Sequence, residues 1–242
     1  LDRHKDDVAC VILDAMPHRV GLVPADPEYV KALREWTLDH DTLLAFDEVI
    51  TFRMEHGGFQ ERYHFCPDLT ALGKMIGGGF PVGAIAGRAD VMEVMNPLAH
   101  EIRFPHSGTF SANPVTMTAG LTAMRKFDRE AVARMNHLSL RAVEGIRDAL
   151  KDTGVPGCVT GGGSMFRVHF RPEPPRNHRE AYRTDEQDRM LAIILDHLFE
   201  SGFLVINTCT FTLSTPMGND EIDALVAAMG EGFEKIKREM KL

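Results

Sequence analysis

Three groups of side chains in this 242-residue sequence could act together on one small ligand. Asp47 follows the apolar run 42–46, and Lys74 follows a short apolar stretch at 69–72. A carboxylate that ends a buried strand needs a cationic or hydrogen-bonding partner. A lysine is a nucleophile only when neutral, because its ordinary pKa of about 10.4 keeps it charged at neutral pH. The turn at 107–109 (Ser-Gly-Thr) offers hydroxyls and backbone N–H groups that could bind a phosphate.

Taken singly, each group also has a structural explanation. Asp47 could cap a neighbouring loop, Lys74 could be a surface lysine before a flexible glycine segment, and 107–109 could be an ordinary helix-entry turn. The combination favours chemistry, because an acid and a lysine that end two strands of one parallel sheet meet at the same edge. With a phosphate site, they match pyridoxal phosphate (PLP), whose ring nitrogen pairs with an acid and whose aldehyde bonds to a lysine.

The elements that would position these groups predict a layered α/β fold in the first half of the chain. Apolar runs typical of buried parallel strands lie at 8–13, 42–46, 69–72 and 82–86. Helices are expected at 27–40, 89–94 and 115–127. The first of these helices has Asp26 as its N-cap and Pro27 at its first position. The strand–helix–strand order favours a sheet with covering helices.

The second half changes character and predicts an α+β unit. Helices are expected at 129–151, 185–201 and 219–237, the last capped by Asn219. Half-exposed or short strands are expected at 165–170, 203–207 and 210–214, with a turn at 159–164 and a loop at 172–183. The change near Asp128 predicts two domains, 1–128 and 129–242.

Three longer motifs resemble the class III aminotransferases of PLP fold type I. They read LAFDEVIT at 44–51, LGKMIGGGFPVGA at 72–84 and HSGTFSANP at 106–114. Their order and spacing are most similar to the branch of glutamate-1-semialdehyde aminomutase and its transaminase relatives, and the resemblance weakens in the C-terminal domain. It implies part of the large PLP-binding domain, a mostly parallel sheet with helices on both faces, followed by a smaller α+β domain.

The resemblance also implies a role for each matching residue. Asp47 would pair with the pyridine nitrogen of PLP, and Val49 would pack on one face of the ring. Lys74 would form the Schiff base with the cofactor and move the proton. Gly108 and Thr109 would bind the phosphate of the partner subunit's cofactor, because family members are homodimers with sites at the subunit interface.

The implied reaction moves an amino group between an amino acid or amine and a keto acid or aldehyde. An alternative is intramolecular amino transfer of the aminomutase type, in which the amino group returns to a neighbouring carbon of the same molecule. A further alternative is a non-catalytic or truncated homologue that serves as a partner protein. These alternatives stay open on the sequence alone.

Two departures from the family pattern bear on the substrate. The family usually carries a glycine within the stretch 51–53, and its absence here is similar to the branch that acts on β-amino acids. In that branch an arginine of a C-terminal loop can hold the substrate carboxylate, but this loop reads NTCT at 207–210 and does not support such a substrate. Arg53, Arg103 and Arg167 remain, and we interpret each as a surface or structural arginine.

Relatives carry a long segment before the position that matches Leu1. That segment supplies the rest of the sheet, a phosphate-binding turn and the aromatic residue that stacks on the cofactor. We therefore expect this sequence to be the C-terminal part of such an enzyme, because half a sheet would expose unpaired edges and apolar faces.

Composition and charge exclude several other classes. The chain is 44% hydrophobic and 26% charged, as is normal for a globular protein. Its 27 basic and 35 acidic residues give a net charge of -8, which argues against a nucleic-acid partner. There is no apolar run long enough for a membrane span, and the four cysteines and 11 histidines show no metal-ligand spacing. We expect a cytoplasmic enzyme without a metal.

Overall fold

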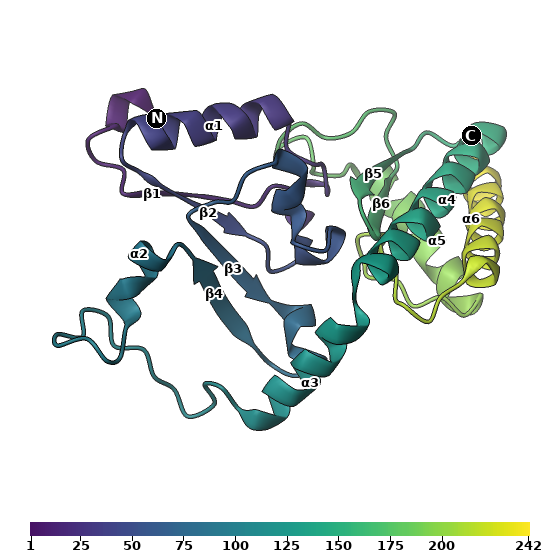
Figure 1. Ribbon diagram of the computed structural model, residues 1–242. Helices are drawn as coiled ribbons and strands as arrows, with labels where there is room; N and C mark the ends of the chain where they lie inside the picture. The colour runs from purple at the N-terminus through teal and green to yellow at the C-terminus, as the bar shows by residue number, and fades with distance from the viewer. The chain divides into compact units, whose positions relative to one another are not determined.

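The structure, a computed structural model, describes every residue from Leu1 to Leu242 and divides into two compact units. The first unit comprises Leu1–Ala15 and Ala25–Arg129, and the second comprises Met16–Pro24 and Glu130–Leu242. Each unit contains one β-sheet with helices packed on it (Figure 1). The short segment Met16–Pro24 therefore belongs to the second unit, although both of its chain neighbours lie in the first.

The sheet of the first unit has four strands in the order β1-β2-β3-β4. Their bounds are β1 (Cys10–Leu13), β2 (Leu43–Asp47), β3 (Leu69–Gly73) and β4 (Gly83–Gly87). The first three strands are parallel, and β4 runs antiparallel to β3. The apolar runs thus predicted all four strands.

Three α-helices connect or follow these strands: α1 (Pro27–Asp39), α2 (Ala89–Met92) and α3 (Pro114–Lys126). The sequence predicted the start of α1 correctly, because the Asp26 carboxylate accepts a hydrogen bond of 2.8 Å from the backbone N–H of Glu28. Short 3-10 helices fill several connections, at Asp2–His4, His18–Val20, Thr51–Met54, Phe59–Tyr63, Lys74–Gly77 and Glu93–Met95.

Helix α1 covers one face of this sheet. Val30 and Leu33 of the helix form a buried cluster with Leu44 and Phe46 of β2. Because side chains alternate along a strand, Ala45 and Asp47 face the opposite side of the sheet. That side is open in this chain: Ile12 of β1, which pairs with Ala45, is 68% exposed.

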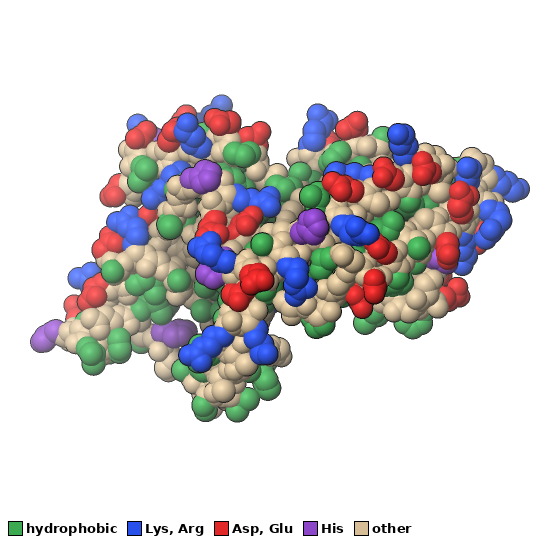
Figure 2. All heavy atoms as spheres, turned by 45° about the vertical axis from the view of Figure 1, so that its right-hand side comes forward, with side chains coloured by type: hydrophobic (Ala, Val, Ile, Leu, Met, Phe, Trp, Pro, Cys, Tyr) green, Lys and Arg blue, Asp and Glu red, His purple; other side chains and the backbone are tan.

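The second unit is an antiparallel sheet covered by long helices. Its strands, in the order β5-β6-β7, are β5 (Cys158–Gly162), β6 (Met165–His169) and β7 (Thr210–Thr212). Its helices are α4 (Arg129–Thr153), α5 (Asp185–Glu200) and α6 (Asn219–Met240). Each helix has one buried apolar face, and acidic and basic side chains are interspersed on the outside (Figure 2).

Two predicted segments of the second unit differ from the structure. The expected turn at 159–164 is mostly strand β5, and only Gly163 and Ser164 form the two-residue hairpin loop to β6. The expected strand at 203–207 does not form, because Phe203 N–H donates to the Leu198 carbonyl and closes the end of α5. Leu204 is consequently 91% exposed.

Two finer expectations in this unit were also wrong. Helix α6 is capped by Gly218, whose N–H donates to the Glu221 carboxylate at 2.8 Å, and not by Asn219. Strand β6 is not half-exposed, since its residues 165–168 are all buried. The alternating pattern of β6 therefore comes from one apolar face and one polar face that is itself covered.

Candidate functional site

Asp47 is the last residue of β2 and lies on the open face of the sheet. Its neighbours on the adjacent strands are small, because Ala71 of β3 pairs directly with it and Ala45 precedes it on the same face. The backbone N–H of Val49 donates to one carboxylate oxygen of Asp47 at 3.1 Å. The result is a half-buried carboxylate beside small apolar side chains.

Lys74 follows the last residue of β3, the strand next to β2. Ala71 lies opposite Asp47, so Lys74 is three residues further along the strand direction than the residue that pairs with Asp47. With strands about 4.8 Å apart and a rise of about 3.3 Å per residue, the Cα atoms of Asp47 and Gly73 lie roughly 8 Å apart. The two side chains thus come from one edge of one sheet.

The backbone at Lys74 is strained. Its φ angle is +49°, in the left-handed region that a lysine adopts at a cost of about 1–2 kcal/mol. Gly73 before it is extended, so the chain turns sharply at the end of β3 and begins the short 3-10 helix Lys74–Gly77. Strain of this kind is typical of functional positions, and Lys74 itself is exposed.

Val49 connects the two loops that carry Asp47 and Lys74. A Cβ atom placed on Gly73 would lie 3.3 Å from Cγ1 of Val49, which shows that this side chain packs directly on Gly73. The N–H of Glu48 also donates to the Ala71 carbonyl at 2.9 Å. Both contacts fix the loop after β2 against the end of β3.

The glycines after Lys74 have a packing role that the sequence did not suggest. A Cβ atom on Gly78 would lie 2.4 Å from the Ala119 carbonyl oxygen, and one on Gly120 would lie 2.2 Å from the Ile76 carbonyl oxygen. Helix α3 therefore approaches the turn 74–78 backbone to backbone. Of the three glycines that follow Lys74, Gly78 therefore serves the packing of this helix.

Gly108 and Thr109 lie in an exposed segment between α2 and α3. The Ser111 N–H donates to the Gly108 carbonyl at 2.9 Å, so the segment does form a turn before α3. The N-terminus of α3 is already capped, because the Asn113 side chain accepts from the N–H groups of Val115 and Thr116. Within this chain, these residues face solvent.

Glu48, the acid next to Asp47, is buried and is hydrogen-bonded to the backbone of a neighbouring loop. Glu48 accepts hydrogen bonds from the N–H groups of Phe59 and Gln60 at 2.9 and 2.8 Å. Burial raises the pKa of Glu48 to about 7, although these two bonds oppose the shift. Gly58 allows this contact, since a Cβ there would lie 2.2 Å from the Glu48 carboxylate. Glu48 thus positions the loop after Asp47.

Asp68, just before β3, is the centre of an ion network that links α1, β2 and the residue after β4. The Asp68 carboxylate accepts from Arg34 of α1 at 2.7 Å and from Arg88 at 2.8 Å. It also accepts from the Leu44 N–H at 2.8 Å. Burial alone would raise the pKa of Asp68, but these donors lower it to about 2.

The three unassigned arginines fall in different environments. Arg103 is exposed, and Arg53 is half-buried with a pKa lowered by burial. Arg167 of β6 is only 5% exposed, so of the two interpretations, a surface or a structural arginine, its burial favours the structural one. Its signal in the sequence was a cation inside a strand whose neighbouring residues are apolar.

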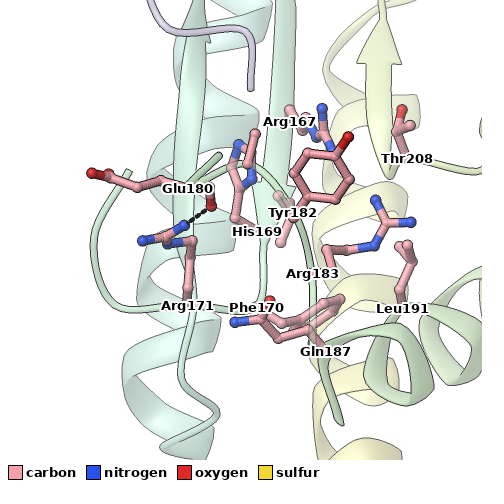
Figure 3. Close-up of a pocket in the computed structure, with 12 residues that line it drawn as sticks. Arg167, His169, Phe170, Arg171, Glu180, Tyr182, Arg183, Gln187, Leu191 and Thr208 are labelled. Carbon is pink, nitrogen blue, oxygen red and sulfur yellow. Dashed lines mark hydrogen bonds between the residues drawn. The ribbon is translucent and has the colours of Figure 1, made fainter. Parts of the chain in front are cut away.

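Arg167 lies on the polar face of the second sheet, which segment Met16–Pro24 covers. Arg167 donates to the His18 carbonyl at 3.2 Å, and Thr160 donates to the Gly21 carbonyl at 2.6 Å. The ring Nε2 of His169 lies 3.0 Å from the same Gly21 carbonyl. Burial, together with the nearby Arg167, lowers the pKa of His169 to about 4. Figure 3 shows Arg167 and His169 beside Tyr182 and Arg183.

No group of three or more His, Cys, Asp or Glu side chains is arranged to hold a metal ion. Every helix is too short or too polar to cross a bilayer.

Comparison with known proteins gives one family. A sequence model described as aminotransferase class-III matches residues 1–225. The glutamate-1-semialdehyde 2,1-aminomutase of Akkermansia muciniphila is 39% identical over 230 residues, which cover 93% of this chain and 53% of that protein. The chain spans about half the length of the curated relatives it matches.

Solved structures give the same fold. An omega-transaminase from Sphaerobacter thermophilus superposes with a TM-score of 0.94 at 41% identity, over 98% of this chain and 54% of that one. A transaminase with PLP bound superposes with a TM-score of 0.91 at 33% identity, over 100% of this chain and 55% of that one.

Proposed function

The chain belongs to the class III aminotransferases, and on that premise we propose that it forms part of a PLP-dependent enzyme that transfers amino groups. The observation that carries the proposal is the position of Asp47 and Lys74 at the ends of neighbouring parallel strands. Ligands of open α/β sheets bind outside these strand ends. The proposed substrates are an amino acid or amine and a keto acid or aldehyde.

The residues at this edge fit the cofactor. A flat ring needs an apolar surface with small side chains, and Ala45 and Ala71 are the small residues beside the Asp47 carboxylate. When bound, PLP supplies an electron sink for the substrate carbon that loses a proton. Asp47 would keep the ring nitrogen protonated, and Val49 would contact one ring face.

Lys74 would hold the cofactor aldehyde through its Nζ atom and then move the proton between carbon atoms. The strained backbone at this residue supports the role, because it directs one particular side chain outward from the strand end. Gly108 and Thr109 would bind the phosphate of the cofactor in a partner subunit. Their exposure in this chain supports a homodimeric enzyme.

The two domains would have different roles in the enzyme. We assign residues 1–128 to the C-terminal portion of the PLP-binding large domain and residues 129–242 to the small C-terminal domain, with the segment Met16–Pro24 contributing to the compact unit of the small domain. The proposed compartment is the cytoplasm, since all four cysteines are free thiols and two of them, Cys10 and Cys66, are exposed.

Covalent capture of the cofactor tests the proposal. The protein is expressed from its complete gene, supplied with PLP, reduced with borohydride and digested for mass spectrometry. We expect a near-visible absorption band before reduction and a pyridoxyl adduct on the peptide that contains Lys74. The Lys74→Ala variant should lose both signals, and a Lys31→Ala variant, changed on the exposed side of α1, should keep them. No band, or an adduct on a different lysine, would refute the proposal and leave the non-catalytic alternative.

An aminomutase reaction is the second candidate, because several relatives at 32–39% identity carry that name. In that reaction the amino group stays in one molecule, so no separate acceptor is consumed. Incubation with a panel of amino donors and added pyruvate separates the two reactions. Steady formation of alanine supports a transaminase, whereas rearrangement of glutamate-1-semialdehyde without alanine supports a mutase.

A further inference from the structure

Glu48 is a buried acid between two residues of the proposed cofactor site. It is 1% exposed, whereas Asp47 before it and Val49 after it are both half-buried. The Val49 N–H donates to the Asp47 carboxylate at 3.1 Å, and the Glu48 N–H donates to the Ala71 carbonyl of β3 at 2.9 Å. These bonds join the three consecutive residues to one another and to the neighbouring strand. A displacement of Glu48 would therefore also displace the carboxylate of Asp47.

Both carboxyl oxygens of Glu48 are held by the connection between β2 and β3. Oε2 accepts from the Phe59 N–H at 2.9 Å, and Oε1 accepts from the Gln60 N–H at 2.8 Å. Gly58, with a φ angle of +88°, makes room for this contact, because a Cβ atom there would lie 2.2 Å from Oε2. Burying a carboxyl group is costly, as the pKa of about 7 shows. Groups buried at such a cost gather at functional sites.

The loop that donates to Glu48 is itself anchored on β2. The Phe59 side chain is fully buried, and its ring packs edge-on against the Tyr63 ring at 5.8 Å between centroids. The Tyr63 ring packs edge-on in turn against the Phe46 ring at 6.0 Å. Phe46 directly precedes Asp47 in β2. The loop therefore provides Glu48 with a fixed support on the same strand that carries Asp47.

We propose that Glu48 is a positioning residue, whose two bonds to the Phe59 and Gln60 N–H groups fix the direction in which the Asp47 carboxylate points. This role rests on the proposed function, in which Asp47 pairs with the ring nitrogen of PLP. Both oxygens of Glu48 are occupied by the loop, so Glu48 acts through Asp47 and not on the substrate. A misplacement of about 1 Å in an active site can reduce the rate about 10²-fold.

The kinetic test uses Glu48→Gln in the protein expressed from its complete gene. Glutamine has the same shape but offers one oxygen and one NH₂ group, so one of the two backbone N–H groups loses its acceptor. We expect kcat for the amino donor to fall about 10–100-fold with KM within about twofold, because the effect is on the transition state. The dissociation constant for PLP should rise about fivefold or more. Glu35→Gln makes the same change at an exposed position of α1 and should alter none of these values.

A second readout needs neither PLP nor turnover. Amide hydrogen exchange of the cofactor-free protein, followed by mass spectrometry, compares the loop 57–62 with strand β2. Glu48→Gln should speed exchange at Phe59 or Gln60 about tenfold or more and leave the amides of β2 unchanged. The cofactor-free variant should melt within about 3 °C of the parent, since the loop keeps its apolar anchors.

A second variant displaces the Glu48 side chain without changing it. Gly58→Ala places a Cβ atom against Oε2 and should reproduce the loss of kcat. Gly154→Ala is the matched control, because Gly154 also has a positive φ angle, +73°, but a Cβ atom there would have no neighbour within 4 Å. Gly154→Ala should leave kcat and PLP binding at the parent values.

The outcomes separate this role from the proposed function. A parent protein without the near-visible band and without the pyridoxyl adduct refutes the proposed function itself. An active parent whose Glu48→Gln variant keeps its kcat and its affinity for PLP refutes only the positioning role. A Glu48→Gln variant that melts about 10 °C or more below the parent and exchanges faster throughout β2 would make Glu48 a structural residue only. A raised KM with unchanged kcat would also overturn the proposal, because it would place Glu48 in substrate binding.

Discussion

The two sheets of this chain differ in whether the face away from the helices is covered. In each unit one sheet face is apolar and packs on helices, through Leu44 and Phe46 in the first unit and through Phe170 and Phe233 in the second. The other face of the second sheet is covered by the segment Met16–Pro24. The corresponding face of the first sheet leaves Ile12 and Ile85 exposed.

This difference separates residues that hold the fold from residues that are available for chemistry. Asp47 lies half-exposed on the open face of the first sheet, whereas Arg167 lies buried on the covered face of the second. The helix-covered faces supply most of the stability through burial. Residues on the open face of the first sheet can therefore change function strongly while changing the free energy of unfolding little.

The largest expected effect contrasts the two faces of the first sheet. Phe46→Ala should lower the free energy of unfolding by about 4 kcal/mol, because the side chain is fully buried and leaves a cavity. Ile12→Ala, on the open face, should change it by no more than about 0.5 kcal/mol. Urea unfolding followed by circular dichroism measures both values. A cost above about 1.5 kcal/mol for Ile12→Ala would mean that another segment or a second copy covers this face.

The next effect tests whether Asp47 serves chemistry and not the fold. Asp47→Asn should reduce kcat/KM for amino transfer by about 10²–10³-fold, the usual cost of removing one stabilising charge from an active site. Its free energy of unfolding should stay within about 0.5 kcal/mol of the parent, since the carboxylate is half-exposed. A variant that unfolds readily, or one that retains full activity, contradicts this assignment.

Asp68 should show the opposite behaviour, because it is a buried acid that holds two arginines. Asp68→Asn should cost about 3 kcal/mol at neutral pH, since Arg34 and Arg88 lose their partner. The pKa of Asp68 is lowered to about 2, so its stabilisation is complete above about pH 4 and is lost as the pH falls toward 2. The difference between parent and variant should shrink by about 1 kcal/mol at about pH 3. A difference that is the same at both pH values would argue against the ion network.

The smallest effect concerns the start of α5 in the second unit. Thr184 accepts from the Gln187 N–H while the Gln187 side chain accepts from the Thr184 N–H, which forms a capping box. Thr184→Ala should lower the free energy of unfolding by about 1 kcal/mol. Thr184→Ser should restore most of that loss in the same urea titration. Equal stability of the alanine variant would show that this helix end contributes nothing to the second unit.

The sequence predicted local structure well where short-range physics decides it. The apolar runs located β1 to β4, and Asp26 with Pro27 located the start of α1, because caps and burial patterns are local signals. The positions of Asp47 at the end of β2 and of Lys74 directly after β3 also followed from the strand pattern.

The misses depended on contacts between distant parts of the chain. The 203–207 stretch has β-branched residues but no strand to pair with, so it stays irregular. Position 161 inside β5 requires glycine, because the Cβ atom of any other residue would collide with the backbone of Met165 across the hairpin. The burial of Arg167 requires the segment Met16–Pro24, which is far away in sequence and could not be placed from a strand pattern.

The most direct test of the central claim is a crystal structure of the protein, expressed from its complete gene, with PLP bound. The account predicts that the cofactor's aldehyde carbon is bonded to Nζ of Lys74 and that the Asp47 carboxylate lies within about 3 Å of the pyridine nitrogen. A cofactor bonded to a different lysine, or an Asp47 carboxylate that makes no contact with the ring, would contradict it.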